Sequence, residues 1–121
     1  MVVIDNSMWN SPQIGQSELT ARKYVRDIFE AAASRLATIN YHTVVTQLII
    51  WKNRPEIDES AEPGEYMKAL VRWKNVRRLT PDNRRVLVAF TTGGNSWARL
   101  RGRARLTSSM CTDKAAVAGE R

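Results

Sequence analysis

The sequence is poor in the residues that most often cross-link small proteins or bind metals. Cys111 is the only cysteine and His42 is the only histidine. An internal disulfide needs two cysteines, and a protein zinc site ordinarily takes three or four ligands, most of them Cys or His. We therefore expect no internal disulfide, no metal site and no cofactor. A lone, unpaired cysteine also indicates a cytoplasmic or other reducing intracellular compartment.

Long apolar runs are missing as well. Only Val2-Val3-Ile4 is apolar before Asp5, and no later run approaches the ~20 apolar residues of a membrane span. We expect no contact with membranes. The 121 residues, 43% hydrophobic and 26% charged, predict one globular domain over residues 1–107. Residues 108–121 are small and polar without apolar periodicity, which predicts a flexible tail.

Two segments have clear helical spacing of apolar residues. Ser17 is a typical N-cap, and the stripe that follows predicts a helix near 18–38. Tyr66, Leu70 and Trp73 follow i, i+4, i+7 and predict a helix near 64–79. Residues 41–52 are ambiguous, because their β-branched side chains favour a strand while their spacing also fits a helix.

A short repeat favours a third helix here, and a strand stays the open alternative. Leu48-Ile-Ile-Trp-Lys-Asn53 returns as Leu70-Val-Arg-Trp-Lys-Asn75. Lys complements the negative end of a helix and Asn tolerates the left-handed capping conformation, so the repeat is typical of a helix C-terminus. We therefore predict that Trp51 and Trp73 are core residues rather than platforms for stacking bases.

The C-terminal third has the pattern of a β-hairpin. Residues 84–91 have a buried middle, and residues 92–96 are rich in turn formers. The segment 97–107 alternates between an apolar or small face, Ala98, Leu100, Gly102, Ala104 and Leu106, and a face of Trp97, Arg99, Arg101, Arg103 and Arg105. Two strands alone are marginal in water, so Val2 to Asp5 or residues 43–50 should add another strand. The predicted class is α+β, with about three helices packed on a small antiparallel sheet that includes this hairpin. The alternative is a mostly α fold.

Positive charge is concentrated in residues 67–107, which carry eleven Lys and Arg against one acid. On a strand, alternate arginines would stand ~7 Å apart, close to the phosphate spacing of an extended single strand. The main hypothesis is therefore a non-catalytic protein that binds nucleic acid with weak sequence selectivity, RNA or single strands rather than duplex DNA. The predicted contact residues are Arg99, Arg101, Arg103, Arg105, Trp97, Arg84, Arg85, Lys74, Arg77 and Arg78.

Both parts of this interpretation have alternatives. The arginines could simply solvate an edge strand and prevent aggregation. Trp97 could stack on a base or pack at the end of the hairpin. A second hypothesis is a structural or adaptor subunit, whose basic surface contacts an acidic protein or another copy of the same chain as a homo-oligomer.

Signals for catalysis are weak, and a small acid/base enzyme is the third hypothesis. Its candidates are Asp5, Glu18 and His42, and it would gain from a pocket that gathers Asp5, His42 and an acid of the loop 56–65. Asp5-Asn6-Ser7 resembles the start of the Asp-x-Ser-x-Ser metal site of von Willebrand A-like domains, but Trp9 stands where the second serine is required. We set this resemblance aside and expect Asp5 to cap a turn.

Overall fold

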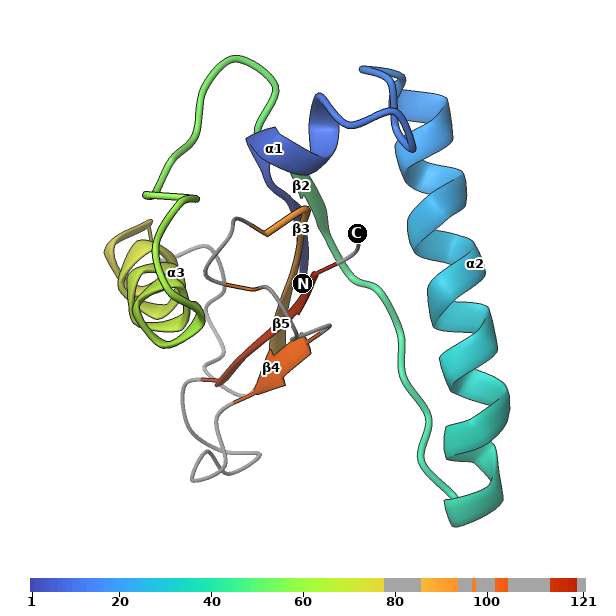
Figure 1. Cartoon of the computed structure of the whole chain (residues 1–121). Coiled ribbons are helices and arrows are strands. Elements are labelled where there is room, and N and C mark those ends of the chain that lie inside the picture. Colours follow the sequence, from blue (N-terminus) through green and yellow to red (C-terminus); the bar gives the residue numbers. More distant parts are fainter. Residues whose placement is uncertain (78–85, 94–96, 98–101, 105–113, 120–121) are drawn as a thin grey trace.

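The computed structural model describes residues 1–77, 86–93, 97, 102–104 and 114–119. In this part of the chain a twisted sheet lies between two long helices, α2 (Glu18–Leu36) on one face and α3 (Pro63–Arg77) on the other (Figure 1). The short α1 (Asn6–Trp9) follows the first strand directly, and a 3₁₀ turn (Ala37–Ile39) continues α2. The strands are β1 (Val2–Ile4), β2 (Leu48–Ile50), β3 (Val86–Thr91), β4 (Gly102–Ala104) and β5 (Lys114–Gly119).

The sheet has the order β2-β1-β3-β5-β4 and is mainly parallel. β1 pairs in parallel with both β2 and β3, and β3 pairs in parallel with β5. Only β4 runs the other way, beside β5. The parallel pairs follow from the order of elements, because a helix connects β1 to β2 and another connects β2 to β3. Such crossovers return the chain to the same end of the sheet.

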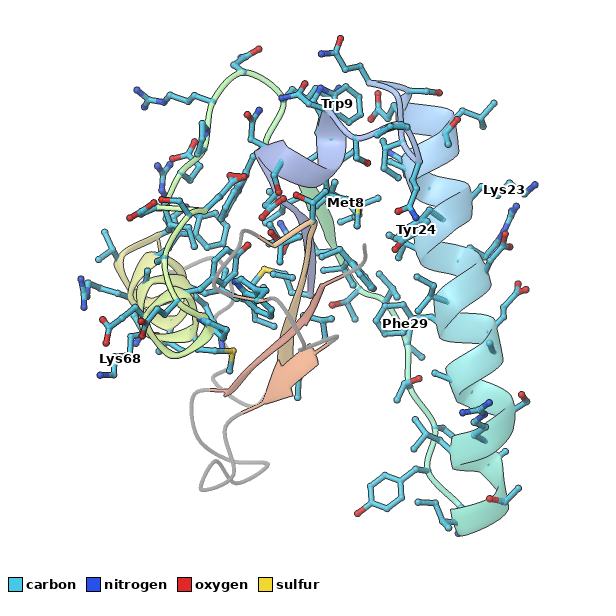
Figure 2. All side chains as sticks on the ribbon, viewed as in Figure 1. Met8, Trp9, Lys23, Tyr24, Phe29 and Lys68 are labelled. Atoms are coloured by element: carbon cyan, nitrogen blue, oxygen red, sulfur yellow. The ribbon has the colours of Figure 1, made fainter. Side chains whose placement is uncertain are left out.

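The core forms two layers, one on each face of the sheet. Val2 and Ile4 pack towards α2 with Phe90, while Val3 packs towards α3 with Leu87 and Ala89. Figure 2 shows Tyr24 and Phe29 of α2 pointing towards the sheet, whereas Lys23 and Lys68 point away from it. The rings of Tyr24 and Phe29 meet Phe90 edge-on, at centroid distances of 5.6 and 6.4 Å. Strands buried on both faces need apolar residues at every position, which explains the unbroken Val2-Val3-Ile4.

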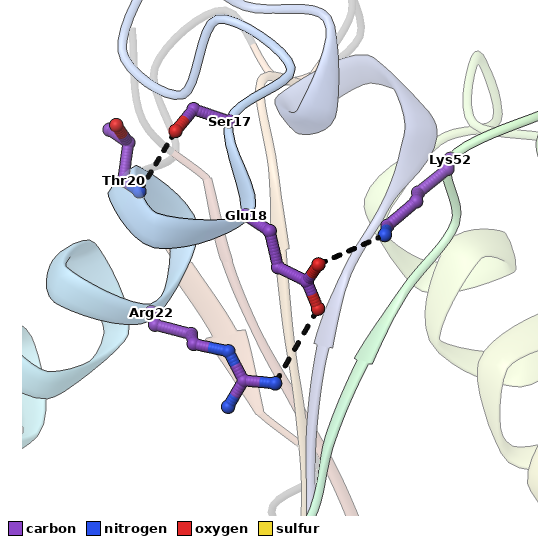
Figure 3. Close-up of polar contacts among 5 residues, drawn as sticks. All are labelled: Ser17, Glu18, Thr20, Arg22 and Lys52. Atoms are coloured by element: carbon purple, nitrogen blue, oxygen red, sulfur yellow. Dashed lines mark hydrogen bonds and ion pairs between the residues drawn. The ribbon is translucent and has the colours of Figure 1, made fainter.

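The N-terminus of α2 is fixed by side chains close in sequence and by one contact from β2. Ser17 accepts a hydrogen bond from the backbone N–H of Thr20 (3.2 Å), which confirms its role as N-cap. Glu18 forms ion pairs with Arg22 (3.5 Å) and with Lys52 (3.3 Å), just beyond β2 (Figure 3). The helices predicted near 18–38 and 64–79 are confirmed as α2 and α3.

The helix predicted over residues 41–52 is wrong. Residues 48–50 form β2, which pairs with β1, and no helix is present between residues 40 and 52. The β-branched side chains of this segment favoured the strand, and tertiary pairing with β1 decided the outcome. The third helix of the structure is instead α1, Asn6–Trp9, which directly follows Asp5.

The predicted hairpin of residues 84–91 with 97–107 is also wrong. β3 has β1 and β5 as its neighbours, so β4 does not pair with it. The α+β class with three helices packed on a sheet is confirmed, whereas the antiparallel character of the sheet and the mostly α alternative are not. β5 lies within residues 108–121, for which the sequence predicts a tail, and there it pairs with β3. A single domain over residues 1–107 remains a prediction.

The two tryptophans of the repeat meet in space although one follows a strand and the other lies inside a helix. Trp51 is buried, Trp73 packs against the same apolar cluster, and their rings meet edge-on at 5.1 Å. Their assignment to the core is confirmed. The interpretation of the repeat as a helix C-terminus is wrong for its first copy, since Trp51 follows β2. In the second copy α3 runs past Asn75 to Arg77, as the predicted helix near 64–79 also does.

Candidate functional site

Polar side chains gather where the parallel strands end. The carboxyl ends of the parallel strands β1, β2 and β3 lie side by side. α/β proteins usually bind ligands at this end of their strands. Asp5 follows β1, Thr91 ends β3, and the loop after β2 brings Glu59 to the same place. We call Asp5, Ser7, Glu59, Tyr66 and Thr91 the carboxylate cluster.

Asp5 is fully buried and is surrounded by hydrogen-bond donors. Its carboxylate accepts hydrogen bonds from the Ser7 hydroxyl (2.7 Å), the Met8 backbone N–H (2.9 Å) and the Tyr66 hydroxyl (2.8 Å). The bond from Met8 makes Asp5 the N-cap of α1, so the prediction that Asp5 caps a turn is confirmed. A buried carboxylate is costly unless it is hydrogen-bonded, and this one has several donors.

Glu59 ties the loop between β2 and α3 to the start of α1. Its two carboxylate oxygens accept hydrogen bonds from the backbone N–H groups of Asn6 (3.1 Å) and Ser7 (2.7 Å). The Asn6 side chain in turn donates to the carbonyl oxygens of Trp51 (2.9 Å) and Lys52 (3.2 Å). Asn6 and Ser7 thus hold this loop at two places, at its start after β2 and at Glu59.

The carboxyl groups of Asp5 and Glu59 both accept hydrogen bonds from Ser7, so they lie close enough for the charge of one to shift the pKa of the other. Burial raises the pKa of Asp5 above its usual range, although the surrounding hydrogen bonds oppose this shift. Burial, and then the negative charge of Asp5, raises the pKa of Glu59 to about 7. Burial and the Asp5 carboxylate also raise the pKa of Tyr66, so its hydroxyl stays protonated and donates. The cluster can therefore hold or release one proton near neutral pH at Glu59.

The carboxylate cluster gathers only part of the site expected for a small acid/base enzyme. An acid of the loop 56–65, Glu59, does lie beside the residues that contact Asp5, but His42 is exposed on the segment before β2. Glu18 is exposed too, and its carboxylate is engaged by Arg22 and Lys52. Without a histidine near Ser7, the hydroxyl has no general base of the usual kind, and it donates to Asp5 instead.

A metal site built from side chains would need several ligands at one place. Among the residues that the structure describes, no group of three or more His, Cys, Asp or Glu side chains could hold a metal ion. The same part of the chain contains no helix long and apolar enough to cross a membrane.

The residues predicted to bind nucleic acid do not form a described surface. Lys74 and Trp97 are buried, and Trp97 packs edge-on against Tyr66 at 5.7 Å, so neither is available for a ligand. Arg77 is exposed and forms an ion pair with Glu56 (2.9 Å). Arg103 lies in β4. The remaining predicted contacts lie outside the described residues; they are Arg78, Arg84, Arg85, Arg99, Arg101 and Arg105.

Sequence reasoning missed three members of the carboxylate cluster: Glu59, Tyr66 and Thr91. The sequence offered an acid of the loop 56–65 without distinguishing Glu59 from the others, and it assigned Tyr66 only to an apolar stripe. A parallel topology would have indicated Asp5 and Thr91 together, since both come at the carboxyl ends of buried strands.

The free edge of β4 is a second feature of functional interest. β4 is the last strand in the sheet order and runs antiparallel to β5, its one neighbour among the described strands. It is three strand positions from β1, and strands lie ~4.8 Å apart, so a ligand on β4 would lie ~14 Å or more from Asp5. The carboxylate cluster and the β4 edge are therefore separate places.

Comparison with protein families identifies the chain. The family model described as Reprolysin (M12B) family zinc metalloprotease matches residues 1–120, and a search of curated proteins finds no match. This match corrects the hypothesis of a non-catalytic protein that binds nucleic acid, because the family consists of catalytic peptidases and implies protein substrates. Of the three hypotheses, the match favours the enzyme. It also corrects the expected cytoplasmic location, because reprolysins are typically secreted or membrane-anchored extracellular proteases. Since the match covers nearly all of the sequence, the chain belongs to the reprolysin (M12B) family of zinc metalloproteases.

Proposed function

We propose that residues 1–121 bind the polypeptide substrate of a peptidase and hold it as an extended strand along the outer edge of β4. The observation that carries this proposal is the position of β4 at the end of the sheet, with β5 on one side only among the described strands. An edge strand presents a row of backbone N–H and C=O groups to which an extended peptide can add. Membership of a protease family makes a polypeptide the expected ligand.

The charge of the sequence segment that contains β4 favours acidic segments of substrate. Residues 67–107 have a net charge of +10, and Arg103 lies in β4 itself. In the sequence, Arg99, Arg101, Arg103 and Arg105 occupy alternate positions, and the proposal gives these arginines acidic substrate side chains as partners. Backbone pairing would supply affinity for any extended peptide, and the arginines would supply the preference.

Zinc, the metal of this family, does not fit the side chains of this chain. Zinc peptidases of this type take their ligands from a His-Glu-x-x-His helix with a further histidine. These 121 residues contain a single histidine and a single cysteine, and the histidine, His42, is exposed. The peptide-hydrolysing step is therefore assigned to no residue here, and the role proposed for residues 1–121 is substrate binding.

Binding of an extended peptide tests this proposal directly. The probe is a fluorescein-labelled ten-residue peptide rich in Glu, titrated with the whole chain and followed by fluorescence anisotropy. Its counterpart with alternate backbone nitrogens methylated should bind about five- to tenfold more weakly, because one or two strand hydrogen bonds are lost. Equal binding of the two peptides would rule out strand addition.

Substitutions in β4 locate the binding edge. Neighbouring residues of a strand direct their backbone groups to opposite sides, so either Arg103 or Ala104 turns its N–H away from β5. Of Arg103→Pro and Ala104→Pro, the substitution at the outward-facing amide should weaken peptide binding while leaving the fold intact by circular dichroism. Ile50→Pro in β2 is the matched control at the opposite edge.

A further inference from the structure

β2 lies at the other end of the sheet, with β1 as its one neighbour among the described strands, and the backbone groups of its outer edge can be assigned. The N–H of Val2 donates to the carbonyl of Gln47 (2.8 Å), and the N–H of Trp51 donates to the carbonyl of Ile4 (3.0 Å). In a parallel ladder every second residue bonds to the same neighbour. Gln47, Ile49 and Trp51 therefore direct their backbone groups to β1, and Leu48 and Ile50 direct theirs outward.

A cleft flanks this edge on the face of the sheet that α2 covers. It has a volume of about 460 Å³ and lies between α2 and the segment that leads into β2. Its apolar lining includes Val25, Phe29, Ala33, Val45 and Leu48. The lining also carries Arg22, Arg26 and Glu30, and the apolar residues give an entering apolar side chain a surface on which to pack.

A second cleft flanks the same edge on the face that α3 covers. It has a volume of about 640 Å³, and it is lined by Ile49 and Ile50 of β2 and by Trp73 of α3. Three basic residues and one acid complete its charged lining, namely Lys52, Arg54, Arg77 and Glu56.

Part of this charge is already balanced. Lys52 pairs with Glu18, and Arg77 pairs with Glu56. Arg54 is exposed and forms no ion pair with any residue that the structure describes. The second cleft therefore favours an acidic side chain near Arg54.

We infer that the outer edge of β2 binds an extended segment of another protein in which apolar and acidic side chains alternate. Successive side chains of a strand point to opposite faces of the sheet, so an added strand would place every second side chain in the apolar cleft beside α2. The intervening side chains would reach the basic cleft beside α3. This surface is distinct from the substrate edge proposed at β4, since the two edges lie at opposite ends of the sheet.

The probe for this edge is a fluorescein-labelled eight-residue peptide of alternating Val and Glu, added to the whole chain. Its affinity should fall about tenfold with Ile50→Pro, which removes an outward N–H at an edge position where proline is tolerated. Arg54→Gln should lower the affinity about threefold. Because the proposed β4 edge would also take an extended acidic peptide, both losses should persist when they are measured in the Ala104→Pro and Arg103→Pro backgrounds. Loss of binding with the β4 variants and not with Ile50→Pro would move the peptide to β4 and overturn the inference.

A second measurement serves if Ile50→Pro fails to fold. The same peptide with its alternate backbone nitrogens methylated should bind the unaltered chain about tenfold more weakly, and Arg54→Gln should still weaken the unmethylated peptide. Undiminished binding in both experiments would contradict strand addition at β2. Sedimentation of the chain alone distinguishes the occupant, because a stable dimer dispersed by Ile50→Pro would mean that a second copy, and not another protein, covers this edge.

Discussion

The two edges of the sheet differ in how the rest of the molecule holds them. The end of β2 is tied to α1 by the Asn6 side chain, and the loop that follows is tied to α1 by Glu59. β4 is held by its pairing with β5, and the chain before it is anchored by the burial of Trp97. The β2 edge thus depends on polar contacts with the carboxylate cluster, and the β4 edge depends on apolar packing. Tyr66 contacts both systems, through its hydroxyl to Asp5 and through its ring to Trp97.

The largest expected loss of stability comes from disturbing the apolar packing of Trp97, which holds the chain before β4. Gly93 has a φ of +68°, and a Cβ there would lie 2.9 Å from Cβ and Cγ of Trp97. Gly93→Ala should lower the free energy of unfolding by ~2–4 kcal/mol, because a left-handed backbone conformation and an overpacked core both oppose folding. Urea unfolding measures the loss, and hydrogen exchange should accelerate in β4 and β5 more than in β2.

Gly15→Ala is the matched control for Gly93. Gly15 has a φ of +60°, but a Cβ there would meet no atom within 4 Å. Its replacement should cost only the ~1–2 kcal/mol of the left-handed conformation. Equal losses for the two variants would mean that the contact with Trp97 contributes nothing to anchoring the chain before β4.

The next effect removes the link between the two edges. Tyr66→Phe keeps a ring against Trp97 but deletes the hydroxyl that donates to buried Asp5. It should lower the free energy of unfolding by ~1.5–3 kcal/mol, because a buried carboxylate loses a donor. Tyr41→Phe, at a half-exposed position, should change stability by less than ~0.5 kcal/mol. Exchange should quicken in the loop after β2 while β4 stays protected; the opposite pattern would contradict the assignment.

A pH titration tests the polar contacts that hold the loop after β2, because Glu59 changes its protonation near neutral pH. The pKa of Glu59 is raised from 4.5 to about 7 in the folded protein, so the folded state binds more protons than the unfolded state between these values. Stability from this group is therefore complete below pH 4.5 and is lost as the pH rises to about 7. After allowance for solvent screening the loss is on the order of 1–2 kcal/mol.

Glu59→Gln should flatten this pH dependence, measured as the midpoint of urea unfolding across the same range. Glu62→Gln, at an exposed position of the same loop, is the control and should leave the profile unchanged. A profile that keeps its full slope in Glu59→Gln would place the titration elsewhere, with Asp5, whose pKa is also raised, as the first candidate.

The smallest effect concerns the ion pair beside the β2 edge. Arg77→Gln removes the pair with Glu56, whose side chains are 51% and 26% exposed. Such a pair contributes ~0–1 kcal/mol, and its loss should disappear at high salt. Lys68→Gln, which removes an exposed pair with Glu65 on α3, is the matched control. A loss well above 1 kcal/mol for Arg77→Gln would show that this pair has a structural role at the edge.

Much of the fold follows from local patterns, and the errors have one physical origin. The apolar stripes of α2 and α3 and the N-cap at Ser17 identify the long helices, because those signals depend on neighbouring residues. The strand at residues 48–50 is different. Three consecutive apolar residues satisfy a buried strand as well as a helix, and only the long-range pairing with β1 distinguishes them. Once β2 was taken as a helix, the crossovers and the parallel sheet could not be predicted.

The candidate sites show the same division. The cap at Asp5 was predictable, because an acid before a short polar turn bonds to nearby backbone amides. Glu59 was not, because its partners Asn6 and Ser7 lie more than fifty positions away and only the folded loop brings them together. The alternating arginines gave a correct indication of charge but a wrong ligand, since a basic surface does not specify which kind of anion it meets.

The central place of β1 has a consequence for biosynthesis. β1 lies between β2 and β3, and its residues Val2 to Ile4 pair with positions 48–50 and 88–90, which come later in the chain. During synthesis this wholly apolar segment therefore lacks its second strand partner until residues 88–90 have been added. Contacts so distant in sequence form slowly, and a chaperone that shields this segment during translation would raise the yield of native protein.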